Sequence, residues 1–207
     1  MFIEHIDQLR CTSGHEESWL VASITKREDR FVLEATLGCH ICRRQYLVTD
    51  GVAYFGTTPG DHRETIAGEA SADSAVRVAA FLNAAEHSTL VLAGEWGIQA
   101  HPLAAMIPMT VFVLAAGGGD SAQVARIESS EGIPLAHASV HGVALDAATA
   151  TPRNIETAVH VLRPGGRLVA PVETDVPASV TVLVRDSAYW VGEREGTREF
   201  VPLRRHV

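Results

Sequence analysis

Three cysteines and a histidine near the amino terminus have the spacing of a metal site. Cys39 and Cys42 form a Cys-x-x-Cys pair, and Cys11 lies upstream with His15 four positions after it. Zinc favours four tetrahedral sulfur and nitrogen ligands, and a Cys-x-x-Cys turn places two thiolates on one side of such a site. The spacing therefore predicts a zinc site of the Cys₃His type, built from two knuckles.

Two other interpretations of these cysteines stay open. The segment could fold as a ribbon without a metal, or the Cys-x-x-Cys pair could carry out redox chemistry. No βαβ pattern surrounds the pair, which disfavours a thioredoxin-like role. His40 could replace His15 as the fourth ligand, although a residue between two ligand cysteines usually points away from the metal.

The residues between the two knuckles have the pattern of a β-hairpin. Residues 19–23 and 30–36 alternate in polarity or are β-branched, and the charged residues 26–29 lie between them. A hairpin that joins two knuckles is the layout of a zinc ribbon. Residues 57–73 are rich in turn-forming and acidic residues and are expected to be a linker, in which residues 63–70 could form a short helix.

The amino-terminal segment resembles a known family over residues 5–56. The resemblance rests on Leu9-Arg10-Cys11, Gly38-Cys39-His40-Ile41-Cys42 and Tyr46-Leu47-Val48-Thr49-Asp50-Gly51-Val52. These motifs resemble the small zinc-ribbon proteins that activate tRNA and translation-factor methyltransferases. The chain departs from the family pattern at Gly14, which stands in the place of a cysteine, and His15 is the substitute ligand. The resemblance implies a module that packs against a methyltransferase sheet, here in the same chain or on a partner.

From residue 74 onward, helices are expected to alternate with apolar strands. Helices are predicted at residues 74–85, 97–106, 121–130 and 153–162, and strands at residues 89–93, 110–115, 133–136, 140–145 and 167–172. Residues 180–184 and 189–192 follow with no room for a helix between them, which predicts an antiparallel hairpin. This alternation is typical of a mostly parallel sheet with helices on both faces.

This second part resembles the class I S-adenosylmethionine (SAM) methyltransferases. Residues 160–169, which contain Leu162-Arg163-Pro164-Gly165-Gly166, resemble the segment before the fifth strand of that family, and residues 133–143 add support. The predicted fold class is α/β, with a Rossmann-like methyltransferase sheet that ends in an antiparallel hairpin and follows a small β-rich zinc-ribbon module. The expected division is residues 1–56 for the ribbon, 57–73 for the linker and 74–207 for the methyltransferase-like domain.

The resemblance places the SAM loop at Gly94-Glu95-Trp96-Gly97, where the family has an acidic-x-Gly-x-Gly-x-Gly motif. In the family, the middle glycine allows the backbone to approach the cofactor. In this chain, a Glu or a Trp stands in its place. The ribose-binding acid is absent from the second strand, since Asp120 comes several residues late, and His137-Ala138 occupy the region of the adenine-binding acid. Each lost anchor would supply about 1–3 kcal/mol.

We therefore expect a degenerate site without SAM, no catalytic residues, and a pseudoenzyme that acts as a scaffold or interaction module. The alternative is an active methyltransferase, in which Trp96 stacks on SAM and Glu95 or Asp120 replaces a lost acid. Six polar or aromatic residues could also meet at the carboxyl ends of the strands and bind a small ligand or metal, although scattered histidines there are usually solvated. They are Glu95, Trp96, His101, His137, His141 and Asp146.

Composition excludes several other classes of protein. The 207-residue chain has a net charge of −8, a sequence pI of about 5.6 and a mean hydropathy of +0.10, which disfavours direct nucleic-acid binding and fits a folded core. It contains neither an apolar run long enough for a membrane span nor a signal-peptide pattern, and three cysteines fit a disulfide framework poorly. A cytoplasmic protein with a protein partner, or a homodimer, is expected.

Overall fold

The computed structural model describes residues 1–60, 70–115 and 121–196. Its eleven strands are β1 (Leu20–Glu28), β2 (Phe31–Cys39), β3 (Gln45–Thr49), β4 (Val52–Phe55), β5 (Thr89–Ala93), β6 (Thr110–Leu114), β7 (Val124–Ser129), β8 (Val140–Ala144), β9 (Leu162–Pro171), β10 (Val180–Arg185) and β11 (Tyr189–Arg194). Its helices are α1 (Ile3–Ile6), α2 (Ala72–Leu82), the 3₁₀ helix η1 (Gly94–Gln99), α3 (Ala100–Met106) and α4 (Pro152–Val161). None of the helices in these ranges is long and apolar enough to cross a membrane. The expected helix at residues 63–70 lies almost wholly outside the described residues.

The strands form one sheet in the order β1-β2-β3-β4-β7-β6-β5-β8-β9-β11-β10. From β7 to β9 the strands are parallel, whereas β11 is antiparallel to both β9 and β10. The predicted fold class is confirmed, since this order and the terminal antiparallel hairpin are those of a Rossmann-like methyltransferase sheet. The apolar runs in β5 and β6 fit their central position, because strands covered on both faces contain little polar sequence.

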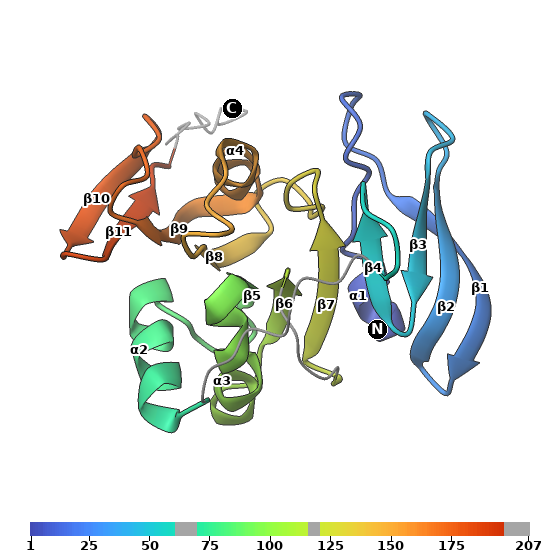
Figure 1. Ribbon diagram of the computed structural model, residues 1–207, viewed down its shortest axis with the longest axis horizontal. Coiled ribbons are helices and arrows are strands. Elements are labelled where there is room, and N and C mark those ends of the chain that lie inside the picture. The colour runs from blue at the N-terminus through green and yellow to red at the C-terminus, as the bar shows by residue number, and fades with distance from the viewer. Residues whose placement is uncertain (61–69, 116–120, 197–207) are drawn as a thin grey trace, which may run out of the picture.

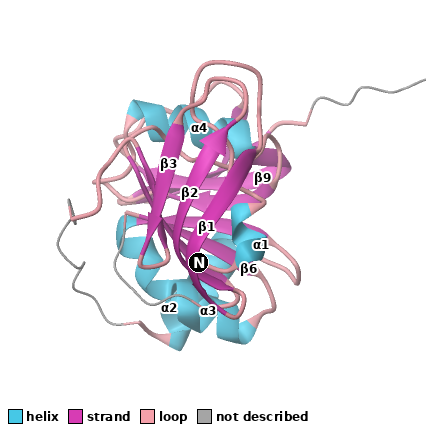
Figure 2. Ribbon diagram, turned by 90° about the vertical axis from the view of Figure 1, so that its right-hand side faces the viewer, coloured by secondary structure: helices cyan, strands magenta, loops and turns pink. Residues whose placement is uncertain are grey.

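The amino-terminal ribbon extends this sheet rather than forming a separate layer. Strands β1 to β4 are an antiparallel meander, and β4 pairs in parallel with β7 through Ala53–Ile127, Tyr54–Glu128 and Phe55–Ser129. Figure 1 shows the meander as a continuation of the sheet, and Figure 2 looks at the sheet from the ribbon side. The ribbon therefore covers what would otherwise be an open edge at β7.

Helices cover both faces of the sheet, as expected. In Figure 1, α4 lies above the sheet, and α2 and α3 lie below it. Leu82 of α2 and Leu103 of α3 belong to one core cluster with the strands, whereas Ile155 of α4 and Ile6 of α1 belong to the other. The start of α4 is capped as its sequence suggests, since the Thr151 hydroxyl accepts a hydrogen bond from the backbone N–H of Asn154 at 3.2 Å.

The prediction of a helix at residues 121–130 was wrong, because the segment contains strand β7. Val124 and Ile127 are three residues apart, as on a helix face, but both are buried between strands. The segment pairs with β6 on one side and β4 on the other. Sheet pairing on both sides outweighs the local helical pattern, as is common for short strands. The strand predicted at residues 133–136 is also absent, and Leu135 makes only an isolated bridge to Leu9.

The segment from Leu162 to Gly166, which was expected to precede the strand predicted at residues 167–172, is part of strand β9. Helix α4 ends at Val161 and β9 begins at the next residue. The pairing of β9 with β8 shifts register between Val140–Leu162 and Gly142–Arg167, so the segment forms an irregularity within the strand. Gly165 has φ +78°, a left-handed conformation that favours glycine.

Candidate functional site

The four predicted metal ligands meet at one end of the ribbon. Cys39 ends β2, Cys42 lies in the turn before β3, and Cys11 and His15 lie in the loop that precedes β1. One potential ligand atom from each residue lies within 4.8 Å of all the others. The Cys11 and Cys42 Sγ atoms are 3.6 Å apart, and Cys39 Sγ is 3.3 Å from His15 Nε2. Tetrahedral zinc with Zn–S bonds of about 2.3 Å needs S–S separations of about 3.8 Å, so the arrangement fits the ion.

Of the two candidate histidines, His15 lies with the three cysteines and His40 does not. The His40 ring lies outside the group, and its Nδ1 is 3.2 Å from the Ser18 hydroxyl. His15 presents Nε2 to the cysteines, while its Nδ1 lies 2.5 Å from the backbone carbonyl oxygen of Glu16. A hydrogen bond at the second ring nitrogen is the usual way in which a protein orients a ligand histidine.

The electrostatics of the cluster favour metal binding by thiolates. Hydrogen bonds from the Ser13 hydroxyl and the Arg44 backbone lower the pKa of Cys42 to about 6. Burial opposes ionisation of Cys39, but backbone N–H groups of Cys42 and Ile41 outweigh it and lower its pKa. The Glu16 carbonyl and the Cys42 sulfur raise the pKa of His15 to about 9. A metal ion would compete with a proton for the His15 ring, because metal binding requires the neutral imidazole.

A second layer of side chains connects the ligand loops to the rest of the sheet. The Tyr46 hydroxyl is 3.2 Å from Cys11 Sγ and accepts a hydrogen bond from the Thr12 N–H at 3.2 Å. The Tyr46 ring packs on Phe55 of β4, with ring centroids 4.5 Å apart. Glu131, in the loop after β7, accepts a hydrogen bond from the Thr12 hydroxyl and pairs with Arg44. The ligand loops are thus tied directly to the loop between β7 and β8.

The predicted cofactor loop forms η1 at the carboxyl end of β5. Its first residue, Gly94, has φ +58°, and a Cβ added there would overlap the Asp146 carboxylate. Asp146 is 4% exposed and accepts hydrogen bonds from the Glu95 N–H at 2.8 Å, the Thr149 N–H at 2.8 Å and the Thr149 hydroxyl at 2.6 Å. The need for glycine at position 94 is therefore explained by a contact within the chain.

Trp96 packs into the protein beneath the loop. Its ring makes edge contacts with Tyr189 of β11 and Phe81 of α2, at centroid distances of 5.0 and 6.5 Å. The indole Nε1 is buried and has no hydrogen-bond partner among the described residues. Residues 94–97 line none of the four main grooves found among the described residues.

Of the six residues that were expected to meet at the carboxyl ends of the strands, Glu95 and Trp96 form part of the cofactor loop and Asp146 contacts it, whereas His137 and His141 lie elsewhere. His141 lies near the amino end of β8, where its Nδ1 accepts a hydrogen bond from the Thr89 N–H at 3.1 Å. His137 lies beside His160, with ring centroids 4.7 Å apart, and its backbone N–H donates to Glu17.

The proposed ligand group of scattered histidines is therefore not formed. His101 lies exposed on α3. Asp120, the alternative ribose-binding acid, lies outside the described residues.

The parts of the site that depend on long-range contacts could not be predicted from the sequence. Tyr46 was recognised only as part of a motif, and its contact with Cys11 spans 35 positions. Glu131 carries no local signal, because its partners Thr12 and Arg44 are 119 and 87 positions away.

Comparison with known protein families finds no matching family model, and comparison with curated proteins finds no match. Solved structures resemble parts of the chain. One is a chain from the complex of the Haloferax volcanii methyltransferase activator Trm112 with a proposed methyltransferase, with 14% identity and a TM-score of 0.47 over 61% of this chain and 90% of that one. A proposed SAM-dependent methyltransferase from Methanococcus maripaludis has 9% identity and a TM-score of 0.45 over 62% of this chain and 87% of that one.

Geranyl diphosphate methyltransferase in complex with SAM has 16% identity and a TM-score of 0.39 over 48% of each chain. The chain thus spans about half the length of that enzyme.

Proposed function

We propose that the chain is a non-catalytic, methyltransferase-like scaffold whose amino-terminal ribbon contains a structural zinc ion. In this proposal, residues 1–56 form the ribbon, residues 74–207 form the methyltransferase-like domain, and residues 57–73 link them. The degenerate loop at Gly94-Glu95-Trp96-Gly97 no longer accepts SAM. The chain then serves as a frame that presents surfaces to a protein partner or to a second copy of itself.

The observation that carries this proposal is the contact between Asp146 and the cofactor loop. In a SAM-binding loop of this family, glycines leave room for the cofactor. In this chain, the Asp146 carboxylate packs against Gly94 and accepts the Glu95 N–H. A buried carboxylate with three hydrogen bonds is costly to displace, because each bond to a charged group contributes about 1.5–3 kcal/mol. SAM would have to break this arrangement or bind elsewhere.

The ribbon supports a structural role within the same chain. The family it resembles acts by packing against a methyltransferase sheet, and β4 pairs with β7 in parallel. Glu131 joins the two parts through Thr12 and Arg44. Zinc at Cys11, His15, Cys39 and Cys42 would hold these loops in position, as structural zinc does in other ribbons.

An exposed apolar patch supports a role in protein interaction. Trp19 and Val21 are 69% and 65% exposed, and Leu47 is 46% exposed. The strand pairing places Val21 and Leu47 on one face of the ribbon, and alternation puts Trp19 on the same face. Ile41, in the Cys-x-x-Cys turn, is also exposed. Clustered apolar side chains on a surface are typical of interaction sites.

Thermal or chemical unfolding in the presence of SAM tests this proposal. A ligand at about 100 times its Kd stabilises a protein by about 2.7 kcal/mol, so SAM at about 1 mM would reveal binding at a Kd of about 10 µM. We expect neither SAM nor S-adenosylhomocysteine to change the unfolding midpoint. A saturable increase in the midpoint would favour an active enzyme.

The second candidate is an active SAM-dependent methyltransferase with a divergent site. A polar groove of about 620 Å³ at the carboxyl ends of β4, β6 and β7 favours it. Hydroxyl groups line this groove, among them those of Thr57, Ser129 and Thr149, together with Glu128. A ribose could bind such a surface through its own hydroxyls. Saturable SAM binding that is weakened by Glu128→Gln would identify this groove as the site.

A further inference from the structure

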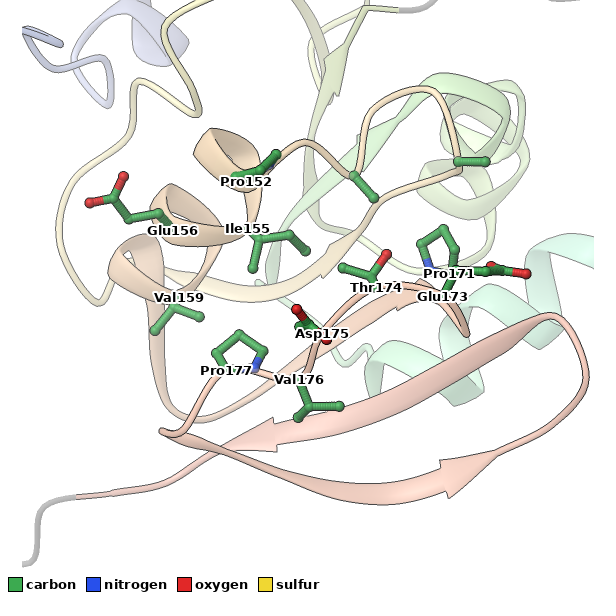
Figure 3. A pocket seen from close by; sticks show the side chains of 12 residues that line it. Pro152, Ile155, Glu156, Val159, Pro171, Glu173, Thr174, Asp175, Val176 and Pro177 are labelled. Atoms are coloured by element: carbon green, nitrogen blue, oxygen red, sulfur yellow. The ribbon is translucent and has the colours of Figure 1, made fainter.

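An apolar groove of about 840 Å³ lies between helix α4 and the loop that connects β9 to β10. Figure 3 shows Ile155 and Val159 of α4 on one side of the groove and Val176 on the other. Pro171 and Pro177 lie at the two ends of the connecting loop segment. Because the groove is at the carboxyl ends of β8 and β9, it occupies an edge where α/β sheets commonly bind ligands.

The connecting loop is held in place by hydrogen bonds within the chain. The indole N–H of Trp190, a fully buried residue of β11, donates to the Thr174 carbonyl at 3.0 Å. The Thr174 N–H in turn donates to the Pro171 carbonyl at 3.0 Å. A groove with such a wall is largely formed before anything binds, which lowers the entropic cost of binding.

The charges around the groove have one sign. Glu156, Glu173 and Asp175 line it, and no lysine, arginine or histidine does. Glu156 is paired with Arg153 at 2.9 Å, whereas Glu173 and Asp175 are exposed beside the apolar wall. The groove therefore fits a ligand that has apolar side chains and positive charge together.

The segment after β11 has this chemistry. Residues 197–207 read Thr-Arg-Glu-Phe-Val-Pro-Leu-Arg-Arg-His-Val, with three arginines against one glutamate in a chain whose net charge is −8. The segment follows Gly196, where an added Cβ would lie 3.4 Å from Pro164, close to the carboxyl end of α4. Helix α4 is about 15 Å long, and eleven extended residues span about 36 Å, so the segment can reach the whole groove.

We propose that the groove is a docking site for a basic and apolar peptide segment, and that residues 197–207 of the same chain occupy it. The apolar residues 200–203 fill the space between α4 and the connecting loop, and Arg204 and Arg205 pair with Glu173 and Asp175. This inference is independent of whether the chain binds SAM.

A competition experiment with the full-length protein tests the proposal. A fluorescent peptide of residues 197–207 is titrated with the wild type and with the variant Arg204→Glu/Arg205→Glu, and binding is followed by anisotropy. If the peptide has a Kd of about 0.1 mM and the attached segment an effective concentration of about 1 mM, the wild type should bind the peptide about 10-fold more weakly than the variant. Adding Glu173→Lys/Asp175→Lys to the variant should remove most of that binding, whereas adding the exposed substitution Glu28→Lys should not.

Three results would overturn the proposal. Equal affinity of the wild type and the Arg204→Glu/Arg205→Glu variant would mean that the segment does not occupy the groove. If the Arg204→Glu/Arg205→Glu variant melts like the wild type but does not bind the peptide of residues 197–207, the groove does not accept this peptide. Peptide binding that is unaffected by the Glu173→Lys/Asp175→Lys change would place the peptide elsewhere and leave the groove to another ligand.

Discussion

Substituting Gly94 with alanine tests whether this glycine serves a cofactor or the protein itself. If Gly94 is present to accommodate SAM, its loss should affect ligand binding and leave most of the stability of the free protein. If it is present because Asp146 packs against it, the loss should destabilise the protein with no ligand added. Gly165 provides a matched control, because it also has a positive φ but has no atoms within 4 Å of an added Cβ.

The expected magnitude follows from two contributions. A left-handed backbone at an alanine costs about 1–2 kcal/mol, and this applies at both positions. At Gly94, the added methyl group must also displace the Asp146 carboxylate, which breaks its hydrogen bond with the Glu95 N–H. A hydrogen bond to a charged group contributes about 1.5–3 kcal/mol. Gly94→Ala should therefore lower the free energy of unfolding by about 2.5–5 kcal/mol, and Gly165→Ala by about 1–2 kcal/mol.

Urea denaturation of both variants, and of Gly94→Ala combined with Asp146→Ala, measures these effects. Removal of the carboxylate makes room for the methyl group, so Gly94→Ala should cost only the backbone contribution in the Asp146→Ala background. The coupling between the two substitutions should then be about 1.5 kcal/mol or more. Equal costs for Gly94→Ala and Gly165→Ala, or additive effects of Gly94→Ala and Asp146→Ala, would refute the reasoning.

Three further predictions concern the metal site, its connection to the sheet, and pH. Elemental analysis should find about one zinc ion per chain in the wild type and almost none in Cys42→Ser, which should also unfold more easily; equal metal content would contradict this. Glu131→Gln and Arg44→Gln should show a coupling of about 1 kcal/mol in urea denaturation, a modest value because Arg44 is partly exposed; additive effects would mean that the pair does not join the two parts. Burial lowers the pKa of His141 below its usual 6.5, so below pH 6.5 the unfolded chain binds more protons than the folded chain. The contribution of His141 to stability should therefore be complete above pH 6.5 and should decrease as the pH falls below that value. The variant His141→Gln should lose part of this pH dependence of the melting temperature, and an unchanged slope would exclude the histidine as its source.

Much of the fold could be predicted from the sequence where local patterns and the final environment agree. The strand at residues 89–93 is apolar after Thr89 and is buried at the centre of the sheet, and α4 (Pro152–Val161) lies within one residue of the helix predicted at residues 153–162. Strand β7 could not be predicted in this way. Its environment is created by β4 and β6, which come from distant parts of the sequence, and that pairing outweighs the helical spacing of Val124 and Ile127.

The candidate sites show the same contrast between local and long-range information. The Cys₃His group was predictable because ligand chemistry restricts residue type and spacing within each knuckle. The connection of the ligand loops to the sheet through Tyr46 and Glu131 was not predictable, because it depends on where the loop after β7 lies in the fold. The difference between residues 94–97 and the glycine-rich motif of the family that this segment resembles could be read from the sequence, but the place of Asp146 against Gly94 could be found only in three dimensions.

A calorimetric titration of the zinc-loaded protein with SAM and with S-adenosylhomocysteine tests the central claim most directly. At about 50 µM protein, such a titration detects any ligand that binds with a Kd of about 1 µM or lower. A Kd of about 1 µM corresponds to a binding free energy of about 8 kcal/mol. The scaffold proposal predicts no heat beyond dilution for either compound. Saturable binding at micromolar concentration, with about one ligand per chain, would contradict it and identify the chain as a SAM-binding protein.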